Sequence, residues 1–400
     1  MNPLNFEETK QRLDGLAVFR ELLKDGAVAA FRELLQDCCR NDADNFVSHC
    51  GEFESLLFQQ SDCWTAYLRR AVMESENVCI RNWASGAVTA VQEECLNREL
   101  AFLDRLSQVT LDDLTAGLDH APDFLVGWRT EGGSIAQDYR QRMQEVGEKG
   151  YGIFARYHMF TVENGQLVPV KHPDPQQLKQ LPGYEQERQK VIANTQALLD
   201  GKPANNVLLY GDAGTGKSSA IKAIANNFAE QGLRLVEVKK NQLYQIPDLM
   251  DRLAANPLKF ILFIDDLSFT ANDDNFAALK AILEGSVGGR AQNIAVYATS
   301  NRRHLIKETM TDRSGDDIHE SDTRQELMSL SARFGLTVTF ASPDRDRYLY
   351  IVGELAKQYG VDLDEHTLAV RSEAFAIRMG GRSARVAKQF IELCKSGVQV

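Results

Sequence analysis

The stretch NNVLLYGDAGTGKSSAIKAIANNFA, residues Asn205–Ala229, decides the fold of this chain. In it a short apolar run leads into the octapeptide GDAGTGKS, and a segment with the apolar spacing of an amphipathic helix follows. This is the pattern GxxxxGK[ST] in the strand, loop and helix context that its chemistry requires. From average residue usage, the four fixed positions would occur by chance in roughly 1–2% of chains of this length. A loop that binds phosphate groups is therefore the first prediction.

Glycine, lysine and serine each have a separate task in such a loop. The glycines let the backbone curl so that successive N–H groups point at phosphate oxygens, and the following helix adds the positive end of its dipole. Lys217 then reaches the outer phosphates, and the hydroxyl of Ser218 binds magnesium. ATP and Mg²⁺ are thus the predicted cofactors. The predicted nucleotide-binding residues of the loop are Gly211, Asp212, Ala213, Gly214, Thr215, Gly216, Lys217, Ser218 and Ser219.

Two further apolar runs end in polar side chains, KFILFIDDLSF at Asp265 and Asp266, and IAVYATSN at Asn301. Open parallel sheets bind ligands at the carboxyl ends of their strands, so these side chains should lie near the phosphate loop. We assign Asp265 to the magnesium, Asp266 to the attacking water as general base, and Asn301 to orienting that water. The alternatives are a plain acidic turn for the two aspartates and a strand-end cap for Asn301.

Beyond Pro173, apolar runs alternate with amphipathic helical patterns, which is typical of a parallel sheet with helices on both faces. Only helical patterns follow Asp344, and they predict a small helical lid. The first part of the chain, from about Phe6 to Leu118, has helical spacing throughout. The predicted strands are Val207–Tyr210, Leu233–Val238, Phe260–Ile264, Ile294–Thr299 and Leu336–Phe340.

The predicted fold class is therefore α/β, with a C-terminal helical lid and an all-helical N-terminal domain. A β-hairpin is expected around the turn Glu163-Asn164-Gly165, in a segment that bridges two domains. The predicted divisions are 1–130 for the helical domain of unknown role, 131–172 for a linker with the hairpin, 173–342 for the α/β ATP-binding domain and 343–400 for the lid.

The composition excludes several classes of protein. With 44% hydrophobic and 25% charged residues, the chain is typical of a folded globular protein. Its net charge of -11 argues against a protein that binds nucleic acid by neutralising phosphates. The chain lacks the pattern of a signal peptide and any apolar stretch near the ~20 residues of a membrane span, which favours a cytoplasmic protein. Six of the seven cysteines lie in the first hundred residues without a CxxC pair, and we interpret them as reduced thiols, with a metal site near His49 as the alternative.

The order of these motifs resembles that of AAA+ ATPase modules: the phosphate loop, the DD and TSN strand ends, then LMSLSARFGL and GGRSAR. The resemblance covers about Pro173–Val400. Within AAA+ proteins, IDDL and ATSNRR are similar to the branch of replication initiators and helicase loaders. The whole run from KQLPGYE to SARFGL resembles still more closely an uncharacterised bacterial family of AAA+-type ATP-binding proteins, a domain of unknown function.

The resemblance implies further site residues. Arg333 matches the arginine that projects into the neighbouring subunit's nucleotide, although Ala332 stands where the family has an acidic residue. In GGRSARVAKQFI, Arg382 best fits the lid arginine that contacts the outer phosphates, with Arg385 as the alternative. The segment LPGYE resembles the part that covers the adenine, and its candidate residues are Leu181, Gly183 and Tyr184.

These motifs predict an ATPase that depends on magnesium and couples hydrolysis to remodelling or loading of a macromolecule. A slow nucleotide-dependent switch or adaptor, a replication helper of the loader type and a small-molecule kinase are the alternatives, because the same loop serves them. The resemblance implies a homo-oligomer, such as a ring, and a protein partner bound through the helical N-terminal domain. Direct binding of nucleic acid or membrane is not expected.

Overall fold

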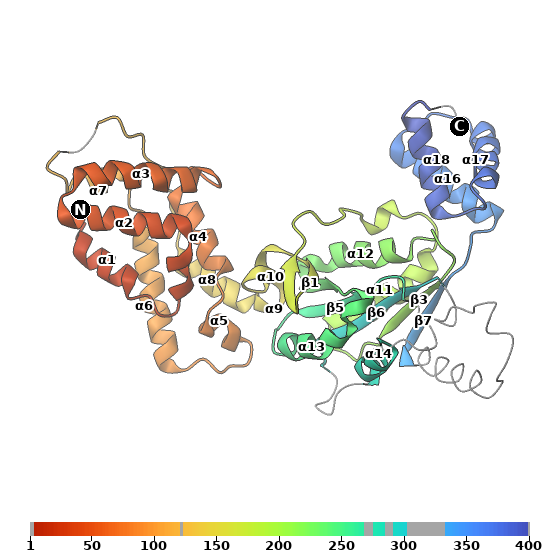
Figure 1. Cartoon of the computed structure of the whole chain (residues 1–400), viewed down its shortest axis with the longest axis horizontal. Helices are drawn as coiled ribbons and strands as arrows, with labels where there is room; N and C mark the ends of the chain where they lie inside the picture. Colours follow the sequence, from red (N-terminus) through yellow and green to blue (C-terminus); the bar gives the residue numbers. More distant parts are fainter. Residues whose placement is uncertain (1–3, 121–122, 268–274, 285–290, 302–332, 399–400) are drawn as a thin grey trace. The chain divides into compact units, whose positions relative to one another are not determined.

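The computed structural model describes the chain except for residues 1–3, 121–122, 268–274, 285–290, 302–332 and 399–400. The chain forms two compact units, Met1–Arg156 and Tyr157–Val400, which are described separately (Figure 1).

The first unit is built from helices. Local side-chain caps set several of their ends: the Asp25 carboxylate accepts the backbone N–H groups that open α2, and left-handed Asn41 closes that helix just before Asp42 caps α3. Two long helices therefore pair across a very short connection. The helices are α1 (Phe6–Asp14), η1 (Arg20–Lys24), α2 (Gly26–Arg40), α3 (Ala43–Phe58), α4 (Trp64–Glu74), α5 (Val78–Trp83), α6 (Ala90–Leu106), α7 (Leu111–Thr115), α8 (Ile135–Gln144), α9 (Val146–Lys149) and α10 (Ile153–Arg156).

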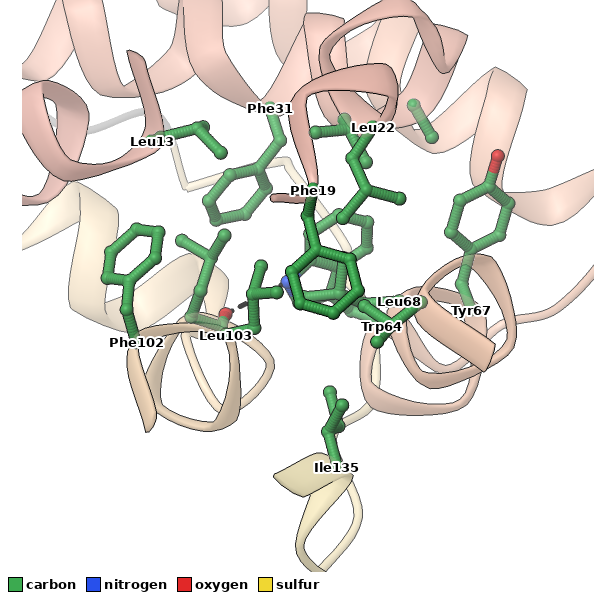
Figure 2. Packing of buried hydrophobic residues seen from close by; sticks show 14 of the residues in the cluster. Leu13, Phe19, Leu22, Phe31, Trp64, Tyr67, Leu68, Phe102, Leu103 and Ile135 are labelled. Atoms are coloured by element: carbon green, nitrogen blue, oxygen red, sulfur yellow. Dashed lines mark hydrogen bonds between the residues drawn. The ribbon is translucent and has the colours of Figure 1, made fainter. Parts of the chain in front are cut away.

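Aromatic and aliphatic side chains together fill the centre of this unit (Figure 2). The ring of Phe31 on α2 stacks on Trp64 of α4 with centroids 4.8 Å apart, and Phe53 of α3 meets Trp64 edge-on at 5.2 Å. The Trp64 indole N–H donates to the carbonyl oxygen of Leu106 at 3.0 Å, so this buried ring also has its polar atom satisfied. One side chain thus ties four helices together.

The carboxylate of Glu99 on α6 binds the backbone of residues 17–19, just before η1. Its carboxylate, in a residue only 8% exposed, accepts the backbone N–H groups of Ala17 at 2.7 Å, Val18 at 3.2 Å and Phe19 at 2.9 Å. Buried N–H groups without acceptors are costly, so this carboxylate fixes the chain that leads into η1.

We therefore expect Glu99→Ala to lower the free energy of unfolding of the helical unit by about 3 kcal/mol, because three backbone donors lose their acceptor. All three tryptophans, Trp64, Trp83 and Trp128, lie in this unit, so their fluorescence during urea unfolding of the full chain reports on it. The exposed Glu94→Ala on the same helix is the control, with an expected change under about 0.5 kcal/mol. Equal stability of the two variants would contradict the role of Glu99.

All seven cysteines of the chain are free thiols. His49 hydrogen-bonds through Nδ1 to the buried Asp37 carboxylate at 2.6 Å, and this bond raises the pKa of His49. Within the described part of the chain, no three His, Cys, Asp or Glu side chains are grouped closely enough to hold a metal ion. His49 is thus engaged in a local ion pair between α2 and α3.

The second unit contains a sheet of seven strands in the order β2-β1-β4-β5-β6-β3-β7, and every neighbouring pair is parallel except β1 and β2. Helix α12 covers one face, and α13 and α14 cover the other (Figure 1). The predicted α/β fold class is confirmed. The strands are β1 (Met159–Glu163), β2 (Gln166–Pro169), β3 (Val207–Gly211), β4 (Leu233–Glu237), β5 (Lys259–Ile264), β6 (Ile294–Ser300) and β7 (Leu336–Phe340). The helices among them are η2 (Leu178–Gln180), α11 (Glu185–Leu199), α12 (Lys217–Phe228), η3 (Ala229–Gln231), η4 (Lys240–Gln245), α13 (Ile246–Ala254) and α14 (Asn275–Glu284).

The predicted hairpin is present, but it does not act as a linker. Asn164 and Gly165 both have positive φ, +50° and +74°, as a two-residue turn between antiparallel strands requires. β1 then pairs in parallel with β4 through Met159 and Leu235, so the hairpin extends the sheet. The rest of the predicted linker, with α8 to α10, belongs to the helical unit.

Three helices follow β7 and form the lid: α16 (Arg345–Tyr359), α17 (Glu365–Arg378) and α18 (Ala384–Lys395). Side chains of Asp344, Asp364 and Ser383 cap their first turns. Their packing buries Tyr348 and Phe390. Nowhere in the described ranges does the chain contain a helix long and apolar enough to cross a membrane.

Candidate nucleotide-binding site

The loop between β3 and α12 has the backbone that its glycines allow: φ is +139° at Gly211, +77° at Gly214 and +91° at Gly216. Residues with a side chain are strained in this range. A side chain at Gly211 would also have no room, because a Cβ there would lie 2.0 Å from the carbonyl oxygen of Phe340. α12 begins at Lys217, and its first N–H groups have no acceptor within the helix. The loop thus offers main-chain donors and a helix N-terminus to an anionic ligand.

Lys217 is only 6% exposed and points back into the loop. Its Nζ donates to the carbonyl oxygens of Gly211 and Asp212, each at 2.8 Å, and to Oδ1 of Asn301 at 2.9 Å. Burial lowers the pKa of Lys217, while neighbouring carboxylates, Asp212 first, act in the opposite direction. Because Asn301 follows β6, the structure brings the loop and this strand end together.

Ser218 and Asp265, the two predicted magnesium ligands, are in direct contact. Oδ1 of Asp265 accepts the Ser218 hydroxyl at 2.6 Å and the hydroxyl of Thr299 at 2.5 Å. Thr299 was not among the predicted site residues; its signal is its place in the same TSN strand end, two positions before Asn301. A hydroxyl and a carboxylate meeting at one point form an oxygen donor set of the kind that Mg²⁺ takes in proteins.

Asp266 has an unusual backbone and one fixed side-chain partner. Its φ is +51°, in the left-handed region that aspartate tolerates better than most residues. Its backbone N–H donates to Oγ1 of Thr299 at 2.9 Å, and its Oδ1 accepts Nδ2 of Asn301 at 2.8 Å. The amide of Asn301 therefore links Lys217 to Asp266, so that the ends of β3, β5 and β6 form one polar cluster.

Tyr184, the candidate adenine contact, is buried and packed on both faces of its ring. The residue is 2% exposed, its ring stacks on Phe340 with centroids 5.2 Å apart, and the Arg347 guanidinium lies 4.9 Å from its centroid. Its hydroxyl donates to the carbonyl oxygen of Ala341 at 2.7 Å. Gly183 beside it has φ +77° and no room for a side chain. Tyr184 thus contacts the end of β7, the residue after it and the first turn of α16.

The two lid arginines have different surroundings. Arg382 forms a bidentate ion pair with Glu373 of α17, at 2.9 and 2.6 Å, which fixes it within the lid. The backbone N–H of Arg385 donates to the carbonyl oxygen of Gly214 at 2.9 Å. The positive charge of Arg385 also contributes to lowering the pKa of Lys217, after the larger effect of burial. Of the two candidates, Arg385 is therefore the one whose main chain contacts the phosphate loop. Sequence spacing alone cannot show that Glu373 lies opposite Arg382.

Arg333, the predicted arginine of the neighbouring subunit's site, is half-buried and lies just before β7. Ala332, which departs from the family pattern, falls outside the described residues. A role for Arg333 in a second copy's site therefore depends on assembly.

The chain matches a known family and is similar to two other proteins. The model of the family described as "Protein of unknown function (DUF815)" matches residues 154–398, well over half of the chain. An AAA-ATPase of Arabidopsis thaliana is 30% identical over 173 residues, 40% of this chain and 30% of the plant protein, so the chain spans less than a third of that relative. The crystal structure of the FIGL-1 AAA domain in complex with ADP matches with a TM-score of 0.39 and 17% identity, over 54% of this chain and 72% of that one.

The family match covers the whole site: the phosphate loop, the ends of β5 and β6, and the lid. The chain belongs to the DUF815 family, and with these features it is an AAA+-type P-loop protein.

Proposed function

We propose that this protein binds ATP with magnesium at the loop Gly211–Ser219 and hydrolyses it. The observation that carries the proposal is the polar cluster at the strand ends, in which Ser218 contacts Asp265 while Asn301 joins Lys217 to Asp266. A loop that only bound phosphate would not need an aspartate fixed beside the lysine.

In this proposal each residue has one task. The main-chain N–H groups of the loop and the Lys217 ammonium bind the phosphates. Ser218 and Asp265 hold magnesium, which when bound would neutralise charge on the outer phosphates. Asp266 accepts a proton from the attacking water, and Asn301 orients that water while its Nδ2 holds the Asp266 carboxylate.

Two arginines complete the site. Arg385 of the lid replaces Arg382 as the residue that approaches the outer phosphates, because its main chain already contacts Gly214. Arg333 enters the site of a neighbouring copy and stabilises charge as the phosphate is transferred. The protein therefore works as a homo-oligomer, and its helical unit binds the macromolecule that hydrolysis remodels or loads.

The first test is titration calorimetry of the full chain with Mg·ATP and Mg·ADP, followed by measurement of phosphate release. Binding with turnover supports the proposal. Binding with almost no turnover would favour the nucleotide switch, in which ATP rearranges the helical unit without fast hydrolysis. A chain that shows no heat with either nucleotide would overturn both.

We expect Arg333→Ala to lower turnover about a hundredfold while Mg·ADP binding stays unchanged, because an arginine supplied by a neighbour acts on the transferred phosphate. Mixing this variant with Asp266→Asn should restore part of the activity, since intact catalytic sites then meet intact arginines in mixed oligomers. Phosphate release by the mixture is the measurement. Full activity of a monomeric Arg333→Ala protein would contradict the role.

A further inference from the structure

The carboxylate of Asp212, a residue of the phosphate loop, binds the chain that leads into the lid. Its Oδ2 accepts the backbone N–H of Ser342 and the Ser342 hydroxyl, each at 2.7 Å. These two bonds lower the pKa of Asp212. Ser342 lies between Phe340, the last residue of β7, and Asp344, the cap of α16. One side chain of the loop is thus bonded to the connection between sheet and lid.

The main chains of the loop and the connection also touch. Gly211 lies directly against the carbonyl group of Phe340, and the Asp212 N–H donates to the same oxygen at 3.2 Å. The Tyr184 hydroxyl donates to the carbonyl oxygen of Ala341, the next residue of the connection. The connection is therefore fixed between the phosphate loop and the segment that precedes α11, so a shift of the loop is transmitted to it.

The loop meets the lid at a second point. The Arg385 N–H donates to Gly214, and a Cβ on Gly214 would lie 3.0 Å from the Ser383 hydroxyl oxygen. The same loop therefore contacts both the base of the lid, through Asp212, and the start of α18, which carries Arg385. The loop's conformation and the position of the lid depend on each other.

We propose that Asp212 is a positioning residue that ties the lid to the phosphate loop, so that phosphates bound in the loop set the position of Arg385. This inference rests on the proposed nucleotide site. Bound phosphate oxygens would restrict the motion of the main chain at Gly211 and Asp212. Because Asp212 accepts two hydrogen bonds from Ser342, the connection before α16 would then be restricted as well.

Hydrogen exchange of the full chain, with and without Mg·ADP, tests this coupling in wild type and in Asp212→Ala. Without nucleotide, Asp212→Ala should speed exchange of the segment 336–350 about tenfold, because the Ser342 N–H loses its acceptor. At a concentration of Mg·ADP that saturates the variant, the nucleotide should no longer protect α18. Turnover should fall about tenfold through kcat, because the Arg385 guanidinium would no longer be positioned at the phosphates.

Two further variants separate coupling from general loosening. Asp344→Ala removes the cap of α16 without touching the loop, so nucleotide should still protect α18 in it. Ser342→Ala removes one of the two bonds, and its effect should disappear in the Asp212→Ala background, because both changes act on one interaction. Wild-type protection of α18 in Asp212→Ala saturated with Mg·ADP would overturn the coupling alone. A wild type that binds no nucleotide would overturn the proposed function as well.

Discussion

Lys217→Ala should abolish binding of Mg·ATP and Mg·ADP, with affinity at least about a hundredfold below that of wild type. The reason lies in the position of the ammonium group. Lys217 is nearly fully buried, and its Nζ lies between the loop carbonyls and Asn301. The change therefore removes the charge-assisted donor that this buried ammonium would offer to the phosphates.

Calorimetry with Mg·ADP is the direct measurement, because it does not require turnover. Lys222→Ala is a matched control on the same helix: its ammonium lies 3.6 Å from Glu237, so its loss should leave binding within about threefold. Lys217→Met, which keeps most of the buried side-chain volume, guards against an effect of misfolding. Tight Mg·ADP binding by both Lys217 variants would show that the loop is not the nucleotide site.

Local patterns explain why the loop and the strand ends could be predicted from the sequence. GDAGTGKS requires positive φ at its glycines, and the structure has it at Gly211, Gly214 and Gly216. Asp265 and Asn301 follow apolar runs directly, and parallel strands bring their carboxyl ends to one edge whatever lies between them. The spacing of residues along the chain is therefore sufficient to predict the loop and the strand-end residues.

Other features depend on contacts between distant segments, and spacing does not carry them. Arg382 and Arg385 are one helical turn apart, and only the position of Glu373 shows that the first is engaged within the lid. Tyr184 packs on Phe340, which lies far along the chain. The hairpin at Asn164 is a local pattern, but its pairing with β4 is not. Each of these contacts joins segments that the local sequence pattern does not relate to one another.

Asp266→Asn should leave Mg·ADP and Mg·ATP binding within about threefold of wild type and lower turnover about a thousandfold, which lies in the range that a general base contributes. The variant keeps the size of the side chain, and its amide oxygen can still accept the Asn301 N–H. It cannot take a proton from water. The expected result is therefore a protein that stays bound to ATP.

Asparagine is the right replacement because of the backbone at this position. At φ +51°, asparagine is tolerated nearly as well as aspartate, whereas alanine would add strain of about 1 kcal/mol that has nothing to do with proton transfer. Phosphate release in a single turnover separates the chemical step from product release. Asp200→Asn, in an exposed residue at the end of α11, is the control and should keep full activity.

Asp265→Asn tests whether the two neighbouring aspartates have different roles, one in binding magnesium and the other in proton transfer. Asp265 contacts Ser218, so its change should raise the magnesium concentration needed for ATP binding, while Asp266→Asn should not. If Asp266→Asn hydrolyses ATP at the wild-type rate, Asp266 is not the base, and its bond to Asn301 only positions Lys217. If both variants need more magnesium, the two carboxylates share one metal-binding role, and the base must be sought elsewhere.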